Sequence, residues 1–164
     1  MSKKRIRKER TPDHGNTTLI EYYRELHRLF HQPHSERMLI IVTHGLIELM
    51  VNLLIQEKLK NADKINSDRC NYPHSVQLVL LNEKGLLDDW FFEQLDWFRD
   101  LRNSAAHNAF FQLADADRQR IDRILRAGPV DPTWTESMEF GTFCSRLVEM
   151  FWNSHAQVFG PKLA

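Results

Sequence analysis

Apolar residues recur every three to four positions along most of the chain, the spacing of helices that each bury one face. No stretch shows the sustained alternation of a half-buried strand, and no internal repeat is present. The pattern therefore predicts an all-helical bundle. The clearest stripes are Phe91, Leu95, Phe98, Leu101 and Ala105 between residues 88 and 107, and Phe140, Cys144, Leu147, Phe151 and Val158 between residues 134 and 159.

Glycine and proline, six of each, fall almost entirely between the apolar stripes and set the expected helix boundaries. Ser35 and Asp88 are suited to cap helix N-termini, and Gly85 is suited to a C-terminal cap. Gly45 and Gly141 lie inside helices, where their small size predicts close helix–helix approach. We expect an all-α bundle of about five to six helices. The expected helices cover residues 19–32, 35–60, 73–84, 88–107, 115–126 and 134–159.

The expected helix at residues 35–60 is apolar on nearly every side, and Glu48 is its only charged residue between positions 38 and 55. A membrane span of this composition would bury a polar stripe formed by His44, Glu48 and Asn52, at a cost of several kcal/mol. We therefore expect the central helix of a bundle, or a helix at a dimer seam, and no membrane partner. The polar stripe either faces water or lines an internal polar site.

Length and charge refine this picture. A chain of 164 residues with 42% hydrophobic and 27% charged residues corresponds to one globular domain, expected at residues 17–164. Residues 1–16 form a basic, disordered tail with a net charge of +4, which leaves −4 on the remainder. An acidic body argues against a broad nucleic-acid-binding face and leaves the tail as a contact for polyanions. Two cysteines and no apolar leader favour a cytoplasmic location.

One short motif carries the candidate chemistry. Residues 102–107 read Arg-Asn-Ser-Ala-Ala-His, so Arg102 and His107 are separated by four residues and Asn103 directly follows the arginine. This motif resembles the signature of the HEPN superfamily, a group of small helical bundles. The preceding long apolar helix and the shorter helix ending in Lys-Gly-Leu-Leu also match, over residues 35–110. The layout is most similar to the branch that includes mannitol-operon-repressor-like proteins, several of which are regulators.

The resemblance implies a metal-independent ribonuclease site, without a cofactor, built where two motifs meet in a homodimer cleft. His107 would act as general base or acid, Arg102 would hold the phosphate, and Asn103 would orient either of them. Geometry alone shows that one regular helix does not bring the two side chains to the same point. At about 100° per residue, Arg102 and His107 diverge by about 140° on a regular helix. Either the helix end unwinds or a second copy completes the site.

A purely structural role is the alternative for the same motif. An arginine and an asparagine near a helix C-terminus commonly bind free carbonyl groups, and the helix dipole favours histidine there. Glu48 would then neutralise a buried Arg102 and tie two helices together.

Three further clusters are weaker candidates. His27, His31 and His34 have a spacing that can bind zinc, but no cysteine or carboxylate pair accompanies them, so surface histidines and no metal are expected. The arginines between residues 118 and 126 alternate with aspartates and predict a salt-bridged, solvated face. The aromatic cluster of residues 88–107 is expected to serve both the core and a dimer contact. Its members are Trp90, Phe91, Phe92, Trp97 and Phe98.

Two functions follow from the sequence. The first is a HEPN-like homodimer that binds or cleaves RNA through Arg102, Asn103 and His107, as an endoribonuclease of the toxin or RNA-processing type, with an antitoxin as one conceivable partner. The alternative is a non-enzymatic regulator or interaction module that resembles mannitol operon repressor and binds a protein partner through its aromatic helix. The sequence leaves open whether the chain is an enzyme.

Overall fold

The computed structural model describes residues 13–30, 35–126 and 136–160, apart from some side chains in the first and seventh helices. Every regular element within these ranges is a helix, which confirms the all-α bundle, although eight helices are present where about five to six were expected. They are α1 (Asp13–Phe30), α2 (Glu36–Lys58), α3 (Ala62–Ser67), α4 (His74–Glu83), α5 (Asp89–His107), α6 (Asp115–Arg126), α7 (Glu136–Ser154) and α8 (Ala156–Phe159).

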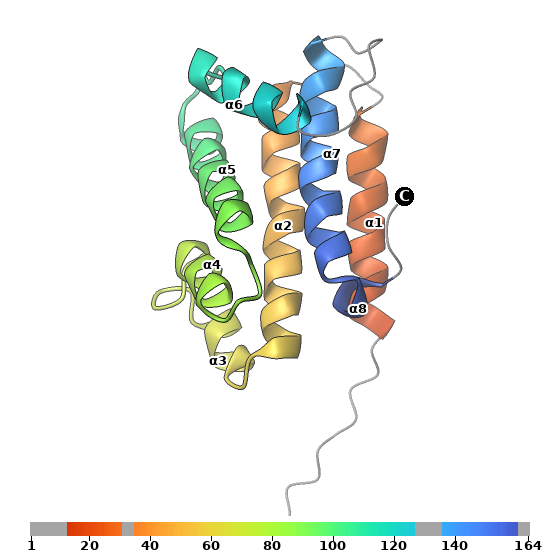
Figure 1. Ribbon diagram of the computed structural model, residues 1–164, viewed down its shortest axis with the longest axis vertical. Helices are drawn as coiled ribbons and strands as arrows, with labels where there is room; N and C mark the ends of the chain where they lie inside the picture. The colour runs from red at the N-terminus through yellow and green to blue at the C-terminus, as the bar shows by residue number, and fades with distance from the viewer. Residues whose placement is uncertain (1–12, 31–34, 127–135, 161–164) are drawn as a thin grey trace, which may run out of the picture.

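The apolar helix α2 occupies the centre of the bundle, as expected. Figure 1 shows α7 and α1 on one side of α2 and α5 with α4 on the other, while α6 lies across one end. By length and composition α2 could cross a membrane, and 56% of its most apolar window is buried inside the bundle. The core helix of a bundle has the same composition because it is surrounded by other helices.

Two short helices were not anticipated. The helix α3 has only six residues, of which Ala62 and Ile65 are buried, too few to produce a recognisable periodic pattern. The last expected helix breaks at His155, so that α8 turns back and Phe159 packs 5.9 Å from the ring of Trp152. The first helix starts earlier than expected, at Asp13, and thereby includes residues 13–16 of the expected tail. The rest of that tail, residues 1–12, lies outside the described residues.

The expected caps are confirmed. The Ser35 hydroxyl accepts a hydrogen bond from the Met38 amide, and the Asp88 carboxylate accepts one of 2.7 Å from Phe91. Gly85 has a φ of +65°, and the amide of the following Leu86 reaches back to a carbonyl of α4. This arrangement ends α4 and redirects the chain into α5.

The expectation for Gly45 is wrong. A Cβ atom placed on Gly45 would meet nothing within 4 Å, so no helix approaches α2 closely at this point.

Aromatic contacts join α5 to α7 in the core. The Phe98 and Phe143 rings lie 6.0 Å apart, and the Phe91 and Phe151 rings lie 5.6 Å apart. Such edge-on and tilted contacts add to the area burial that stabilises the bundle. They fix the position of α5, the helix whose end carries the candidate motif.

Candidate functional site

The motif occupies the last turns of α5, and the helix stays regular to its end. His107 is the last helical residue, and the amide of Asn108 still donates to the carbonyl of Ser104 at 3.0 Å. The helix therefore does not unwind between Arg102 and His107, and the two side chains leave it about 140° apart. Unwinding of the helix end, one of the two ways to bring Arg102 and His107 together, is therefore excluded.

Arg102 is half-buried and keeps its charge unneutralised. Its Nη1 donates to the Oδ1 of Asn103 at 3.2 Å. Among the described residues, no carboxylate forms an ion pair with Arg102. Asn103 thus orients the arginine rather than His107. A guanidinium with free donors at a surface is suited to bind a phosphate group.

His107 is exposed to solvent at the end of α5. Within the part of the chain that the structure describes, its ring forms no hydrogen bond or ion pair. An imidazole in this setting can exchange protons with a bound substrate.

A second arginine, missed in the sequence, lies beside the motif. Arg37, in the first turn of α2, donates from Nη2 to the carbonyl of Ala106 at 3.4 Å. It satisfies one of the free carbonyls at the end of α5. Only the antiparallel packing of α2 against α5 brings Arg37 to this place, so no local pattern could have identified it.

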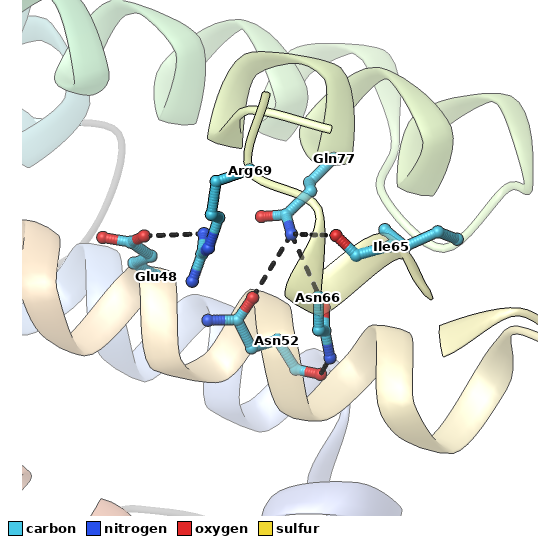
Figure 2. A network of polar contacts seen from close by, with 6 residues as sticks. All are labelled: Glu48, Asn52, Ile65, Asn66, Arg69 and Gln77. Carbon is cyan, nitrogen blue, oxygen red and sulfur yellow. Dashed lines mark hydrogen bonds and ion pairs between the residues drawn. The ribbon is translucent and has the colours of Figure 1, made fainter. Parts of the chain in front are cut away.

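The suggested ion pair between Glu48 and Arg102 is not formed. Glu48 instead binds Arg69, with 2.9 Å between Oε1 and Nη1 (Figure 2). The polar stripe of α2 faces neither open water nor an empty site at this point. It lies under α3 and α4, whose side chains cover it.

A polar network joins this part of α2 to α3 and α4 (Figure 2). Asn66 donates from Nδ2 to the carbonyl of Asn52 at 3.0 Å. The buried Gln77 directs its Nε2 toward the side chains of Asn52 and Asn66 and the carbonyl of Ile65, at 3.4 to 3.5 Å. These contacts hold the α3–α4 segment against the bundle, which is a structural role.

The remaining member of the stripe, His44, packs against His74 at the start of α4. The ring centroids lie 5.0 Å apart in an edge-on arrangement, and His44 is 5% exposed. The Nε2 of His44 and both ring nitrogens of His74 are buried without a hydrogen-bonding partner among the described residues. We call these two residues the histidine pair.

Burial keeps the histidine pair uncharged. Loss of solvent lowers the pKa of His44 to about 3, and the nearby His74, Arg102 and Arg99 lower it further. Burial also lowers the pKa of His74, although Glu48 and the side chain of Gln77 act in the opposite direction.

No described group of three or more histidine, cysteine or acidic side chains is arranged to bind a metal ion. The side chains of His27, His31 and His34, the candidate zinc cluster, lie outside the described residues. Cys144 is buried, and burial raises the pKa of its thiol to about 12, so it is not a nucleophile at neutral pH.

The aromatic cluster of α5 is mostly internal. Trp97 stacks under the guanidinium of Arg120 at 4.7 Å and donates from its indole nitrogen to Asp117 at 3.0 Å. Trp90 is 46% exposed and borders an open hollow of about 440 Å³, with Arg123 and Ile124 of α6 on the opposite wall. The core role of the cluster is confirmed, while its dimer contact stays a prediction.

The salt-bridged character of α6 is confirmed only in part, since Arg120 lies over Trp97 and binds Gln94 instead of a carboxylate. Arg118 pairs with Glu36 at 3.0 Å, and Arg126 pairs with Asp122 at 2.6 Å. Pairs this exposed contribute little stability, so they mark a solvated face.

Comparisons of this chain with protein-family models, with curated proteins and with solved structures each gave no match. Function is therefore inferred from the residues and their geometry.

Proposed function

We propose that this chain is a HEPN-like protein that acts as a homodimeric, metal-independent endoribonuclease, with a composite site of Arg102, Asn103 and His107. The observation that carries this proposal is the combination at the end of α5 of a guanidinium without a carboxylate partner and an exposed imidazole. A purely structural arginine would be neutralised by a carboxylate or would bind carbonyl groups, and Arg102 does neither among the described residues.

A second copy supplies what one subunit lacks. Because α5 stays helical through His107, the arginine and histidine of one subunit point in different directions. Apolar side chains beside the motif offer a surface for the second copy. Met38 is 44% exposed and Ile41 is 41% exposed, and Ile41 shares one face of α2 with Arg37 and His44. Covering this surface would bring two α5 ends together.

The chemistry is a transesterification within the RNA backbone. The ribose 2′-oxygen forms a bond to the adjacent phosphorus while the bond from phosphorus to the 5′-oxygen breaks, giving a cyclic phosphate and a 5′-hydroxyl. One His107 removes the proton of the 2′-hydroxyl, and the partner's His107 protonates the leaving oxygen. Arg102 binds the phosphate oxygens, where negative charge grows in the transition state.

The test is cleavage of mixed RNA in the presence of a chelator. We expect cleavage by the native protein and a loss of about 100-fold or more in His107→Ala and in Arg102→Ala. Arg28→Ala is the matched control, because Arg28 is an exposed arginine on α1, on the other side of α2 from α5, and is paired with Glu25. It should cleave at the native rate. Absence of cleavage by the folded native protein would overturn the nuclease proposal.

The alternative function, a non-enzymatic regulator, is favoured by one observation. Trp90 stands half-exposed at the hollow between α5 and α6, opposite Arg123, and an aromatic ring beside an arginine is typical of protein-binding surfaces. Under this alternative Trp90→Ala abolishes binding of a protein partner, while substitutions at Arg102 and His107 leave that binding unchanged.

A further inference from the structure

Phe110 is the most exposed large apolar side chain among the described residues. It is 90% exposed, whereas the other large exposed apolar residues reach at most 46%. It lies in the segment between α5 and α6, three residues after His107. Complete exposure of a phenylalanine has no stabilising role in the isolated subunit, so a ligand or partner for this ring must be considered.

The backbone around Phe110 is held in place. Its amide donates to the Oδ1 of Asn108 at 3.0 Å, and the amide of Phe111 donates to the Asn108 carbonyl at 3.2 Å. Phe111 packs against the core and Leu113 is buried. Two adjacent phenylalanines thus take opposite roles, one anchoring the segment and one directed into solvent.

The surroundings of Phe110 are polar and carry unneutralised positive charge. His107 and Phe110 are three residues apart, so their Cα atoms are separated by at most about 10 Å. Phe110 therefore lies within two nucleotides of a phosphodiester bound at His107. Arg102 and Arg37 contribute guanidinium groups that no described carboxylate neutralises. These charges favour a negatively charged ligand.

The isolation of the ring indicates the class of ligand. The exposed residues nearest to Phe110 in sequence are His107, Asn108, Ala109 and Gln112, and none of them has a large apolar side chain. A stable protein interface needs a larger apolar centre than one ring. An exposed aromatic ring just past the end of α5, where Arg37 reaches the Ala106 carbonyl, instead matches the recognition of unpaired nucleotides, in which a base stacks on the ring and arginines bind the phosphates.

We propose that Phe110 is a specificity-determining residue that stacks on an unpaired RNA base next to the phosphodiester bound at His107. This inference rests on the proposed ribonuclease function and specifies its substrate as single-stranded RNA. A base inside a duplex is already stacked on its neighbours and cannot lie on the ring, so the duplex is excluded.

The test is the binding of a short 2′-O-methyl RNA, which has no free 2′-hydroxyl and so is not cleaved, with 2-aminopurine placed at successive positions. We expect the native protein to bind the single strand more tightly than the duplex and to quench 2-aminopurine at one position. Phe110→Ala should weaken binding about 5- to 150-fold and abolish the quenching. Phe110→Trp should preserve both. Tyr22→Ala is the matched control, because Tyr22 is an exposed aromatic residue on α1, on the other side of α2 from α5, and it should bind as the native protein does.

Three outcomes overturn the inference. Unchanged affinity and quenching in Phe110→Ala shows that the ring does not touch the RNA, and native cleavage in the same variant then leaves the ribonuclease proposal intact. A lower oligomer mass of Phe110→Ala in light scattering, with quenching unchanged, assigns the ring to the subunit interface. A native protein that neither binds nor cleaves RNA overturns the proposed function together with this inference.

Discussion

Two polar regions border the same helix and differ in how their groups are partnered. Under α3 and α4, Glu48 pairs with Arg69, and the amides of Asn66 and Gln77 bind oxygens of neighbouring residues. At the other end of α2, His107 faces solvent, and among the described residues neither Arg102 nor the ring nitrogens named above for the histidine pair have a partner of opposite charge or a hydrogen-bonding partner beyond Asn103. Burying polar groups without partners costs free energy, and this cost falls on the histidine pair, because His107 is exposed and Arg102 is only half-buried.

The difference originates in which part of α2 is covered. Arg37, Ile41, His44, Glu48 and Asn52 all fall on one face of α2, because they are three or four residues apart. The segment from α3 to α4 covers the second half of this face and supplies polar partners (Figure 2). It reaches only as far as the histidine pair, and the first half stays open beside the motif. Structural residues and candidate functional residues thus occupy consecutive turns of the same face of α2.

The largest expected effect on stability is the response of the histidine pair to acid. In the unfolded chain His44 takes up a proton as the pH falls below its ordinary pKa of 6.5, whereas in the folded protein it stays neutral down to about 3. Acid therefore favours the unfolded state. We expect the free energy of unfolding to fall by up to about 1.4 kcal/mol per pH unit across this window, measured by urea unfolding.

The variant His44→Phe tests the origin of this pH dependence. It keeps a ring against His74 but cannot titrate, so the slope should flatten below pH 6.5 and the protein should be at least as stable at neutral pH. The same slope in native protein and variant would show that other groups cause the acid sensitivity.

A smaller effect is expected from the partnered region. Gln77→Ala removes a fully buried side chain and the donor shared by Asn52 and Asn66, which should lower the free energy of unfolding by about 1–3 kcal/mol. Arg102→Ala, by contrast, should change the unfolding free energy by less than about 0.5 kcal/mol, since no carboxylate depends on Arg102. Equal losses in the two variants would mean that the motif is structural as well.

The smallest effect concerns the uncovered half of α2. Gly45→Ala should raise the free energy of unfolding by about 0.5–1 kcal/mol, because alanine favours the helix and its methyl group meets no atom within 4 Å. Differential scanning calorimetry of the isolated subunit measures this. A loss of stability, or a loss of dimer without a change in the subunit, would show that the space beside Gly45 is occupied in solution.

Local sequence signals were sufficient to predict the helix ends that are fixed by residues of the helix itself. The caps at Ser35 and Asp88 and the glycine turn at Gly85 lie where their residue types require them. The bounds of α6, Asp115–Arg126, are those expected from its amphipathic pattern. The short α3 and the break at His155 were missed, because a few residues give no periodic pattern and a buried histidine carries no boundary signal.

Site residues beyond the motif could not be found in this way. Arg37 lies 69 positions before Ala106, and His44 lies 30 positions before His74; neither pair has a local signature. The partner of Glu48 was also missed: Arg102 was the partner expected under a structural role of the motif, and only the packing of the α3–α4 segment brings Arg69 to Glu48.

The sequence by itself determined the all-helical architecture, the central place of the apolar helix α2 and the location of the motif at a helix end. These depend on hydrophobic periodicity and capping, which act over a few residues. Only the tertiary structure decided which polar groups are paired and which are left open. Whether a polar group finds a partner depends on the distances between helices that are remote in sequence. Burial sets the free-energy cost of leaving such a group without one.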